Sequence, residues 1–557
     1  MAHSKSRAGS VPADSSFDVV VVGFGGAGSA AALEAVGAGA RVLVVDRFGG
    51  GGATKMCAGI VYLGGGTDQQ RRAGFDDTPE AMEAYLRTET AGAVDDDTVR
   101  AFCRESLPNY RWLRSHGVGF PEEFYAPKTT VPGDRYGLYY SGNELQRADA
   151  AAPIPRGHRV AGEGLSGKYL YAALSASVIA SGATVWSHTE AVRLLTDDSG
   201  AVEGVELRVI DGRWARARHK AMAQTYAALA AAGMPGARRA LRALRDFEVR
   251  HGRTVTVRAQ AVVLCSGGFV FSPELMDLHA GPYRDVAPLG TAGDDGAALR
   301  LGTAVGAATG QLDRFAASRF ICPPDAFVCG VLVNAAGERI CDETLYGASL
   351  SANIADKGAG EAYLVIDHGL WLRAHEEMQD EERLRDLPMR VVLSGGQNHL
   401  VFRKGTAWLN RHVNRKRART LADLGRAAGI DPAGLAATVA AYNDDAAAGR
   451  PDSHGKAAGY VSPLVTAPFY AIDAGLGSKL FPAPCLSLGG LQVDGTTGAV
   501  RNTGGDQIAG LYAAGRAAVG VSSRSYVSGL SIADGIFSGR NAGRAAAEAA
   551  TASRALR

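Results

Sequence analysis

The chain has 557 residues and a formal net charge of +2 at pH 7, with 46% hydrophobic and 21% charged residues. This balance is ordinary for a globular protein and excludes a general electrostatic attraction to nucleic acid or to an anionic membrane; the length predicts two domains. The seven cysteines are scattered without a C-x-x-C or C-x-x-C-H pattern, so no zinc, iron–sulfur or c-type haem site is expected, and no metal of another kind.

The first sixteen residues are polar and small. They lack an apolar segment, which predicts a disordered tail and not a signal peptide. No apolar run reaches the roughly 18 residues that a membrane-spanning helix needs. An odd, dispersed set of cysteines fits a reducing compartment better than a disulfide framework. We therefore expect a cytoplasmic protein.

Residues 17–46 predict a strand, a glycine turn, a helix and a second strand. Gly23, Gly25 and Gly28 form G-x-G-x-x-G. The first glycine permits the tight turn, the second lets the backbone approach a pyrophosphate, and the third lets the helix pack close to the strand. Asp46 ends the second strand, where an acid can accept hydrogen bonds from both ribose hydroxyls. The pattern predicts a dinucleotide site; the alternative is a glycine-rich turn that binds nothing.

Two further glycine clusters follow, at 49–52 and at 64–66. Bare backbone beside a dinucleotide lets amides reach phosphate and ring edges, so these clusters are expected to face the ligand. Residues 78–117 predict a helical scaffold, in which the acidic run Asp95–Asp97 caps the helix that follows it.

The next stretch contains Tyr136, Tyr139 and Tyr140. These tyrosines could pack on the surface or wall an apolar pocket, and we favour surface packing. Residues 162–180 then predict a helix, and residues 182–195 predict a pair of strands.

Residues 214–250 are rich in alanine and arginine and are broken by Gly233-Met234-Pro235-Gly236. We interpret this segment as a helical hairpin. It is either an exposed insertion between two strands of a sheet or a basic amphipathic element that touches a membrane surface or a partner subunit. We favour the exposed insertion, because alanine-rich helices carry little apolar anchor.

A strand at 255–269 ends in Ser266-Gly267-Gly268. It offers bare backbone at the carboxyl end of a strand, where ligands bind in open α/β sheets. A helix is predicted at 293–310. From about 313 to 466 the chain changes character, with irregular strands and mixed charges, and we interpret this part as a second domain that closes over the first.

Within the second domain we expect a β-hairpin at 328–346, a charged, solvated helix at 376–385 and an amphipathic helix at 420–443. After it, residues 510–515 predict the last strand of the nucleotide sheet. Residues 527–546 predict a long helix whose N-terminus points back at the cofactor.

Several motifs occur in order along the chain: the N-terminal turn, GGAT (51–54), LCSGGF (264–269), GVLVNAAGERICDE (330–343), SLGG (487–490), LYAAG (511–515) and SGLSIADGIFSGRNAGR (528–544). Together they resemble the fumarate reductase/3-ketosteroid dehydrogenase superfamily of FAD flavoproteins. The resemblance covers nearly the whole chain except residues 214–250. It implies FAD, bound non-covalently because the S-H-T-x-x-A-Q-G-G pattern of histidyl-flavin is absent.

The resemblance also implies an α/β fold. A Rossmann-like FAD-binding domain of the glutathione-reductase type would comprise residues 17–312 and 467–557, interrupted by the hairpin at 214–250. An inserted α+β capping domain that carries catalytic residues would comprise residues 313–466.

Residues at the matching positions are expected to bind FAD. Ala191 and Val192 would pass the adenine, and Arg516 stands where many flavoproteins carry an acid for the ribityl chain. The predicted cofactor-binding residues are Gly23, Gly25, Gly26, Ala27, Gly28, Asp46, Arg47, Gly52, Ala53, Thr54, Ala58, Gly59, Ala191, Val192, Ser266, Gly267, Gly268, Gly515, Arg516, Gly529, Leu530, Ser531 and Ile532.

Within the superfamily, GGATKMCAGIVYLGGGT, ETLY and SYVSGLSIADG look most like the 3-ketosteroid Δ4-dehydrogenases. Carried over from that family, the catalytic set is Tyr346, Tyr526 and Ser528. Fumarate reductases have an arginine for the substrate carboxylate where Tyr526 falls, whereas a phenol is a neutral donor that suits a ketone on a large apolar molecule. Arg524, two residues earlier, leaves a shifted carboxylate clamp as an alternative.

The resemblance implies insertion of a C4–C5 double bond into a saturated 3-ketosteroid, with a hydride passing to flavin N5. Tyr526 is expected to polarise the ketone, Ser528 to face the carbon 4 proton and Tyr346 to relay it, and the two tyrosines could exchange roles. The alternatives are Δ1 desaturation, an ene reductase acting on an enone or an unsaturated acid, and a non-enzymatic flavin-binding scaffold whose basic hairpin docks a partner. The electron acceptor and the oligomeric state are left open.

Overall fold

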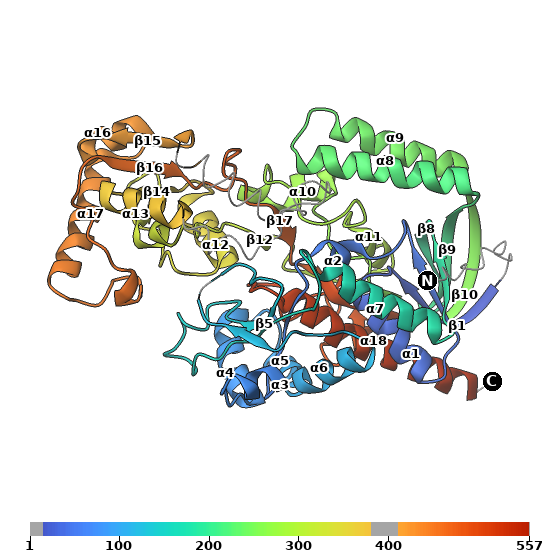
Figure 1. Ribbon diagram of the computed structural model, residues 1–557. Coiled ribbons are helices and arrows are strands. Elements are labelled where there is room, and N and C mark those ends of the chain that lie inside the picture. The colour runs from blue at the N-terminus through green and yellow to red at the C-terminus, as the bar shows by residue number, and fades with distance from the viewer. Residues whose placement is uncertain (1–14, 128, 323, 380–409, 411, 556–557) are drawn as a thin grey trace.

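The computed structural model describes residues 15–127, 129–322, 324–379, 410 and 412–555. Nearly all of the predicted N-terminal tail lies outside these residues, as does the larger part of the predicted helix 376–385. Figure 1 shows two lobes, one around the nucleotide turn and one formed by the middle of the chain, with the hairpin of α8 (Arg213–Ala231) and α9 (Ala237–His251) above the first.

An eight-stranded sheet carries the nucleotide turn, and its main strand order is β19-β20-β10-β1-β2-β7. β1 pairs in parallel with both β10 and β2, so the carboxyl ends of these strands meet at one edge, as in the predicted Rossmann-like fold. The strands are β1 (Ser15–Val22), β2 (Val42–Asp46), β7 (Thr184–Ser187), β8 (Thr189–Thr196), β9 (Val202–Ile210), β10 (Gly252–Leu264), β19 (Ala499–Arg501) and β20 (Gln507–Ala513).

Helices from opposite ends of the chain cover one face of this sheet: α1 (Gly26–Gly37) and α18 (Leu530–Ala555), with α7 (Gly167–Ala180) beside them. α1 and α18 are in backbone contact, because a Cβ added at Gly539 would lie 2.4 Å from the Ala27 carbonyl oxygen. One added at Gly543 would lie 2.2 Å from that of Ala31. The predicted return of the C-terminus to the nucleotide turn is confirmed.

A second, four-stranded sheet, ordered β3-β6-β5-β4, packs beside the first lobe with the predicted helical scaffold. Asp95 caps α5, since its side chain accepts a hydrogen bond from the Thr98 amide. The elements are α2 (Gly52–Met56), β3 (Ile60–Tyr62), α3 (Asp68–Arg72), α4 (Pro79–Thr90), α5 (Asp96–Arg104), α6 (Ser106–Ser115), β4 (Glu123–Tyr125), β5 (Tyr136–Tyr139) and β6 (Gly157–Arg159).

The other lobe is built on a four-stranded sheet, ordered β13-β14-β16-β15. Its last strand in the sequence, β16, lies beyond the boundary predicted at residue 466, so this sheet extends to Asp473. The division into domains otherwise stays a prediction. The elements are β13 (Val331–Val333), α12 (Gly347–Gly358), β14 (Tyr363–Ile366), α13 (His368–Gln379), β15 (Arg415–Ala418), α16 (Leu421–Ala428), α17 (Pro432–Ala447) and β16 (Phe469–Asp473).

Short ladders join the two lobes. β12 (Phe315–Ala317) pairs with β17 (Cys485–Ser487), and β11 (Thr309–Gly310) pairs with β18 (Gly490–Leu491). Residues 313–317 leave the first lobe and residues 485–491 return to it, so these ladders close the connection between the lobes.

Two predicted helices differ from the structure. The helix expected at 293–310 is only α11 (Ala297–Thr303), because Gly296 adopts a left-handed conformation before it and the chain then leaves for β11. The helix expected at 420–443 is two helices, α16 and α17, because Gly429 is left-handed and Pro432 begins a new helix.

The helical hairpin predicted at 214–250 is confirmed as α8 (Arg213–Ala231) and α9 (Ala237–His251). It connects β9 to β10, whose residues Ile210 and Gly252 are antiparallel partners at its base. α10 (Pro273–His279) lies beneath its far end (Figure 1).

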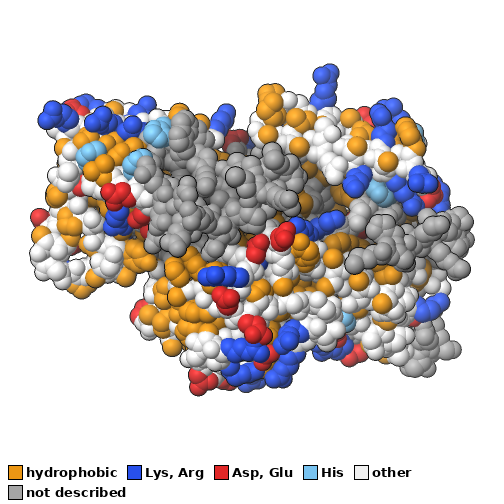
Figure 2. All heavy atoms as spheres, viewed as in Figure 1, with side chains coloured by type: hydrophobic (Ala, Val, Ile, Leu, Met, Phe, Trp, Pro, Cys, Tyr) orange, Lys and Arg blue, Asp and Glu red, His pale blue; other side chains and the backbone are white. Residues whose placement is uncertain are grey.

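On the face shown in Figure 2, Lys and Arg side chains lie scattered among acidic and hydrophobic ones and form no continuous basic surface among the coloured residues. Within the described ranges, no helix is long and apolar enough to cross a membrane. The same residues contain no group of three or more His, Cys, Asp or Glu side chains that could hold a metal ion.

Candidate active site

A cavity of about 970 Å³, the central cavity, lies at the carboxyl edge of the main sheet and reaches the second lobe. Most residues predicted to bind the cofactor line it, together with all three predicted catalytic residues. The predicted residues in its wall are Gly23, Gly25, Gly26, Ala27, Asp46, Arg47, Gly52, Ala53, Thr54, Ala58, Ala191, Ser266, Gly267, Tyr346, Gly515, Arg516, Tyr526, Ser528, Gly529, Ser531 and Ile532.

Four predicted residues support this wall from behind. A Cβ at Gly28 would lie 1.9 Å from the Gly23 carbonyl oxygen, and one at Gly59 would lie 2.2 Å from the Ser166 hydroxyl. One at Gly268 would lie 2.3 Å from the Ser487 hydroxyl, and Leu530 is fully buried. These residues shape the wall through close packing and do not face the cavity.

Ala191 and Val192, predicted to pass the adenine, lie differently in the structure, and their role stays a prediction. Ala191 lines the central cavity, but Val192 does not, and it is 38% exposed. A register shift between Ala191 and Arg193 in the pairing of β8 with β9 interrupts the alternation of side chains. Val192 and Arg193 are both exposed as a result.

The glycine turn has the geometry that a dinucleotide needs. Gly23 has φ +107°, a left-handed value that favours glycine. At Gly25 an added Cβ would meet nothing closer than 3.7 Å, so this backbone stays open toward the cavity. The helix that starts at Gly26 presents its N-terminus there, and one of its amides already donates to the Thr54 hydroxyl over 3.0 Å. This arrangement suits a diphosphate.

Asp46 is held by the backbone around it. Its carboxylate accepts hydrogen bonds from the amides of Phe24 (3.0 Å), Phe48 (2.9 Å) and Gly50 (3.0 Å). These bonds shape the loop after β2 and occupy both lone pairs of Oδ1 but only one of Oδ2, so the predicted contact with ribose hydroxyls stays a prediction.

Arg47 lines the central cavity, but its guanidinium is occupied by carboxylates. It forms two hydrogen bonds of 2.8 Å with Glu248 of α9 and one of 2.8 Å with Asp295. Its three nitrogens therefore bind the hairpin and the loop before α11, and a direct contact of this guanidinium with the cofactor is not favoured.

Arg516 is the basic group at the other end of the glycine-lined wall. Its Nη2 donates to Asp294 over 2.5 Å. Its Nη1 is buried and has no hydrogen-bond partner among the described protein atoms. A buried guanidinium with an unused N–H group is costly unless a ligand accepts from it, so the site fits a polar cofactor such as a flavin. Asp294 was missed in the sequence, where it lies in a segment expected to be helical.

The predicted catalytic residues meet where the second lobe closes the cavity. The ring centroids of Tyr346 and Tyr526 are 6.3 Å apart, and Phe320 packs edge-on against Tyr346 at 5.3 Å. Ala316 and Ala348 add small apolar surface to the same wall. The wall suits an apolar ligand that carries an oxygen.

Burial widens the pH range in which both of these phenols stay protonated. It raises the pKa of Tyr526 to about 12 and raises the pKa of Tyr346 well above its ordinary value, the latter with help from the neighbouring phenols. At neutral pH each side chain is therefore an uncharged hydrogen-bond donor.

Ser528 is fixed by its backbone and faces a third tyrosine. Its amide donates to the Ser141 carbonyl (3.1 Å), and the Ser141 hydroxyl donates to the Ser528 carbonyl (3.0 Å). Its hydroxyl lies 3.4 Å from that of Tyr139, which is fully buried. The prediction that the tyrosines of 136–140 pack on the surface is wrong for Tyr139. The sequence shows three tyrosines close together but not which of them points inward.

Tyr346 is held in place from both lobes. Its amide donates to Asn143 Oδ1 over 2.6 Å. Three residues earlier, the buried Glu343 accepts from Lys456 at 2.7 Å and from Arg339 at 2.8 Å. The ETLY segment is thus positioned by charges inside the second lobe and by an amide from the first.

Arg524 is exposed and does not line the central cavity. The described arginines that do line it, Arg47 and Arg516, are each paired with a carboxylate. The shifted carboxylate clamp that the sequence left open has no arginine in place.

Comparison with known proteins agrees with this geometry. The family profile for the FAD binding domain matches residues 18–532. The chain is 36% identical, over 505 residues, to a 3-oxo-5-alpha-steroid 4-dehydrogenase of Comamonas testosteroni, covering 89% of this chain and 92% of that protein.

Two solved structures share the fold. One is the 3-ketosteroid-delta4-(5alpha)-dehydrogenase of Rhodococcus jostii RHA1 in complex with 4-androstene-3,17-dione, with TM-score 0.77, 29% identity, and coverage of 97% of this chain and 99% of that one. The other is the 3-ketosteroid delta1-dehydrogenase of Sterolibacterium denitrificans, with TM-score 0.61, 18% identity, and coverage of 96% and 100%. The second likeness speaks for the fold alone.

The cofactor is FAD, and the enzyme is an oxidoreductase of the class that acts on CH–CH bonds. With a family profile over most of the chain and a relative at 36% identity, the chain belongs to the FAD-dependent 3-oxo-5α-steroid 4-dehydrogenase family.

Proposed function

We propose that this enzyme introduces the C4–C5 double bond of a saturated 3-ketosteroid. The observation that carries the proposal is the substrate end of the central cavity, where Tyr346 and Tyr526 present neutral phenols over an apolar wall. A neutral donor matches a ketone on a large apolar molecule, and it matches a dicarboxylate poorly. The steroid named with the Rhodococcus jostii structure is a molecule of this kind.

Bound FAD, held by the glycine turn, Ser531 and Arg516, would supply the hydride acceptor. The remaining chemistry belongs to side chains. Tyr526 donates a hydrogen bond to the ketone oxygen and so makes the carbon 4 proton more acidic. Ser528, whose hydroxyl lies beside the same cavity, takes that proton, and Tyr346 hydrogen-bonds to Ser528 as its relay partner.

Tyr139 orients the Ser528 hydroxyl from the first lobe. Its hydroxyl lies 3.4 Å from the Ser528 hydroxyl and 3.2 Å from the Thr130 carbonyl oxygen. A phenol has one proton to donate. When Tyr139 donates to Thr130, its oxygen can accept a hydrogen bond from Ser528, which leaves a lone pair of the Ser528 hydroxyl directed at the carbon 4 proton.

The geometry also bears on the alternative activities. An enzyme acting on an unsaturated acid needs a cation for the carboxylate, and Arg524 lies outside the cavity wall. For Δ1 against Δ4 desaturation, the 36% identity to a 4-dehydrogenase supports Δ4, whereas the likeness to the Δ1 enzyme extends only to the fold. Anaerobic bleaching of the flavin by a saturated 3-ketosteroid distinguishes a steroid dehydrogenase from an ene reductase and from a scaffold without activity. Identification of the product double bond then distinguishes Δ4 from Δ1 desaturation.

Tyr526→Phe tests the proposal directly. Without the phenolic donor, turnover of a saturated 3-ketosteroid with an artificial electron acceptor should fall by roughly 100-fold or more, because one donor to a developing oxyanion is lost. FAD should stay bound, and the flavin spectrum reports whether it does.

Tyr140→Phe is the matched control. Tyr140 lies outside the cavity wall, with its hydroxyl 3.5 Å from the Pro153 carbonyl oxygen, and its loss should leave turnover within about twofold. Near wild-type turnover of the Tyr526→Phe enzyme with FAD bound would remove Tyr526 from the mechanism.

The enzyme also needs an electron acceptor, and its hairpin of α8 and α9 has an exposed side away from the substrate. The electron acceptor is left open. The exposed side of the hairpin carries Trp214 and several basic residues, which supports contact with a membrane surface or a partner subunit. Co-sedimentation with anionic vesicles, compared with neutral ones, tests this contact.

A further inference from the structure

Helix α8 forms one wall of the central cavity. The residues that line it recur every three or four positions, so they occupy a single face of the helix. This face consists of Lys220, Ala223, Gln224, Ala227, Ala228 and Ala231. The alanines allow close approach, and a cation and an amide supply the polar groups. The hairpin is therefore more than an exposed insertion between β9 and β10.

The contacts of α8 place it at the end of the cavity marked by Asp46. His219 of α8 packs on the ring of Phe48, two residues after Asp46, with centroids 5.0 Å apart. His219 Nδ1 also lies 3.0 Å from His188 Nδ1, and His188 precedes the strand that carries Ala191. Tyr526 and Ser528 lie at the end that the second lobe closes. α8 is thus beside the part of the site expected to hold ribose and adenine.

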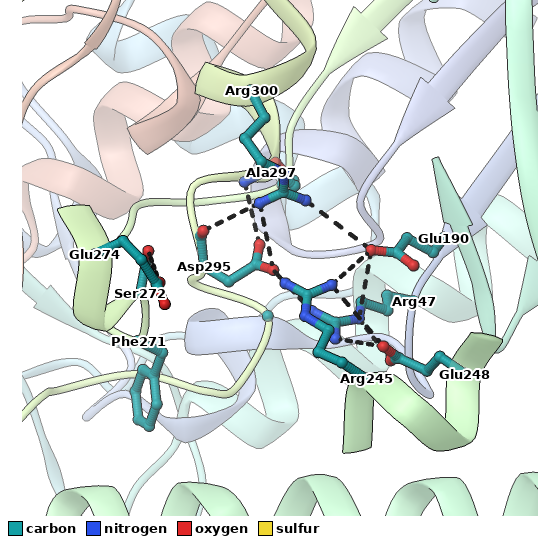
Figure 3. A network of polar contacts seen from close by, with 12 residues as sticks. Arg47, Glu190, Arg245, Glu248, Phe271, Ser272, Glu274, Asp295, Ala297 and Arg300 are labelled. Atoms are coloured by element: carbon teal, nitrogen blue, oxygen red, sulfur yellow. Dashed lines mark hydrogen bonds and ion pairs between the residues drawn. The ribbon is translucent and has the colours of Figure 1, made fainter. Parts of the chain in front are cut away.

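A buried group of charges, the hairpin ion cluster, ties α9 to the nucleotide domain (Figure 3). It comprises Arg47, Glu190, Arg245, Glu248 and Asp295. Glu248 of α9 binds Arg47 at 2.8 Å, while Arg245, one turn earlier, binds Glu190 at 2.8 Å and Asp295 at 2.5 Å. The carboxylate side chains of Glu248 and Asp295 are only 2% and 4% exposed.

Each charged side chain of the hairpin ion cluster has an oppositely charged partner. Burial alone would raise the pKa of Glu248, but the hydrogen bond from His219 and the guanidinium of Arg47 lower it to about 2. Paired, hydrogen-bonded charges of this kind hold a single geometry, and removing one partner leaves another buried charge uncompensated.

A further hydrogen bond anchors α8. The hydroxyl of Tyr226 donates to the Phe271 carbonyl oxygen over 2.6 Å, next to Ser272, which caps α10. Figure 3 shows Phe271 and Ser272 across from the ion cluster. Both helices of the hairpin are therefore fixed to segments that also line the cavity, since Phe271 and Asp295 belong to its wall.

We propose that the α8–α9 hairpin covers the adenosine half of FAD, with the α8 face in contact with that half and the hairpin ion cluster holding the helix against it. The hairpin then makes the protein selective for FAD over FMN, which lacks the adenylate. The inference depends on the FAD cofactor and not on the steroid, so its failure would leave the proposed reaction standing.

Ala227→Glu tests the contact. A carboxylate on the cavity face would oppose the adenylate by charge and by volume, while glutamate keeps the helix. We expect the Kd of the apoprotein for FAD, measured by flavin fluorescence quenching, to rise by about tenfold or more, and the Kd for FMN to change by less than about twofold. Ala221→Glu, the same change on an exposed residue of α8 outside the cavity wall, should alter neither constant.

Glu248→Gln tests the ion cluster in the holoenzyme. After dilution, FAD should leave this variant at least about tenfold faster than it leaves the parent, seen as the rise of free-flavin fluorescence. Asp246→Asn, an exposed acid on the same helix, should release FAD at the parental rate. Unchanged FAD binding and release in both Ala227→Glu and Glu248→Gln would overturn the proposal. So would an equal loss of FMN and FAD, because it would show general damage to the site.

Discussion

Burial sets the chemistry of individual side chains in this enzyme. Burial raises the pKa of Tyr346 and of Tyr526 above that of an ordinary phenol, so both stay uncharged donors even at alkaline pH. Arg516 is a cation in the sequence, yet its Nη2 is bound by Asp294, and its buried Nη1 has no hydrogen-bond partner among the described protein atoms. In each case the function depends on the neighbours and not on the residue type alone.

Burial of Glu144 makes the stability of the protein depend on pH. It is buried, with one carboxylate oxygen bonded to the Gly142 amide and the other without a partner among the described residues. Burial raises its pKa from 4.5 to about 7. Between these values the folded protein holds a proton that the unfolded chain releases, so stability falls as pH rises through this window.

Glu144→Gln should remove that dependence. The shift corresponds to a free energy of unfolding of about 3 kcal/mol that the parent loses between about pH 4.5 and pH 7 and that the variant keeps. Urea unfolding at pH 5 and pH 8 measures the difference. An exposed control, Glu163→Gln, should follow the parent. The same pH dependence in Glu144→Gln and parent would show that Glu144 stays ionised in the fold.

At the scale of elements, the nucleotide turn depends on close backbone contact. Gly28, in the first turn of α1, lies against the Gly23 carbonyl oxygen, and there is no room for a methyl group between them. Helix α18 approaches the other side of α1 through Gly539 and Gly543. The position of the helix N-terminus, and hence of its amides, follows from these contacts.

Gly28→Ala should displace α1 and abolish FAD binding. The added Cβ would lie 1.9 Å from a backbone oxygen, so the strand and the helix must separate. Gly37→Ala, at the exposed end of the same helix with nothing within 4 Å of the added Cβ, should leave FAD bound and stabilise the protein by about 0.5–1 kcal/mol. The flavin content of the purified proteins and their thermal unfolding decide between these outcomes. FAD bound at full occupancy in Gly28→Ala would contradict the packing argument.

At the scale of the whole molecule, Asn143 joins the two lobes beside the active site. Its Oδ1 accepts from the Tyr346 amide at 2.6 Å, and its Nδ2 donates to the Ser349 hydroxyl at 2.9 Å. Both partners belong to the segment that begins α12 in the second lobe. A buried amide from the nucleotide lobe therefore sets where the catalytic Tyr346 stands.

Asn143→Ala should lower kcat by about tenfold or more while FAD stays bound, because small displacements of a catalytic group are costly. Steady-state turnover and the flavin spectrum test this. Asn353→Ala, which removes only a bond within α12 to the Ser349 carbonyl, should keep kcat within about twofold. If both variants turn over at the parental rate, Tyr346 is positioned without Asn143.

The amino-acid sequence alone determined the features with local causes. The nucleotide turn follows from glycines at positions where φ and close approach demand them, and the hairpin follows from helical periodicity broken at 233–236. The family, FAD and the meeting of Tyr346, Tyr526 and Ser528 at one cavity were also within reach, because the motifs occur in order along the chain.

Only the tertiary structure decided the rest, where the partner is distant in the chain. Arg516 meets Asp294 across 222 positions, Arg47 meets Glu248 across 201, and Tyr139 meets Ser528 across 389. No local pattern marks such pairs, since hydrogen bonds and ion pairs depend on distance in space. The same holds for α8: its alanines indicate a helix, but only packing onto the nucleotide lobe makes one face of it a wall of the central cavity.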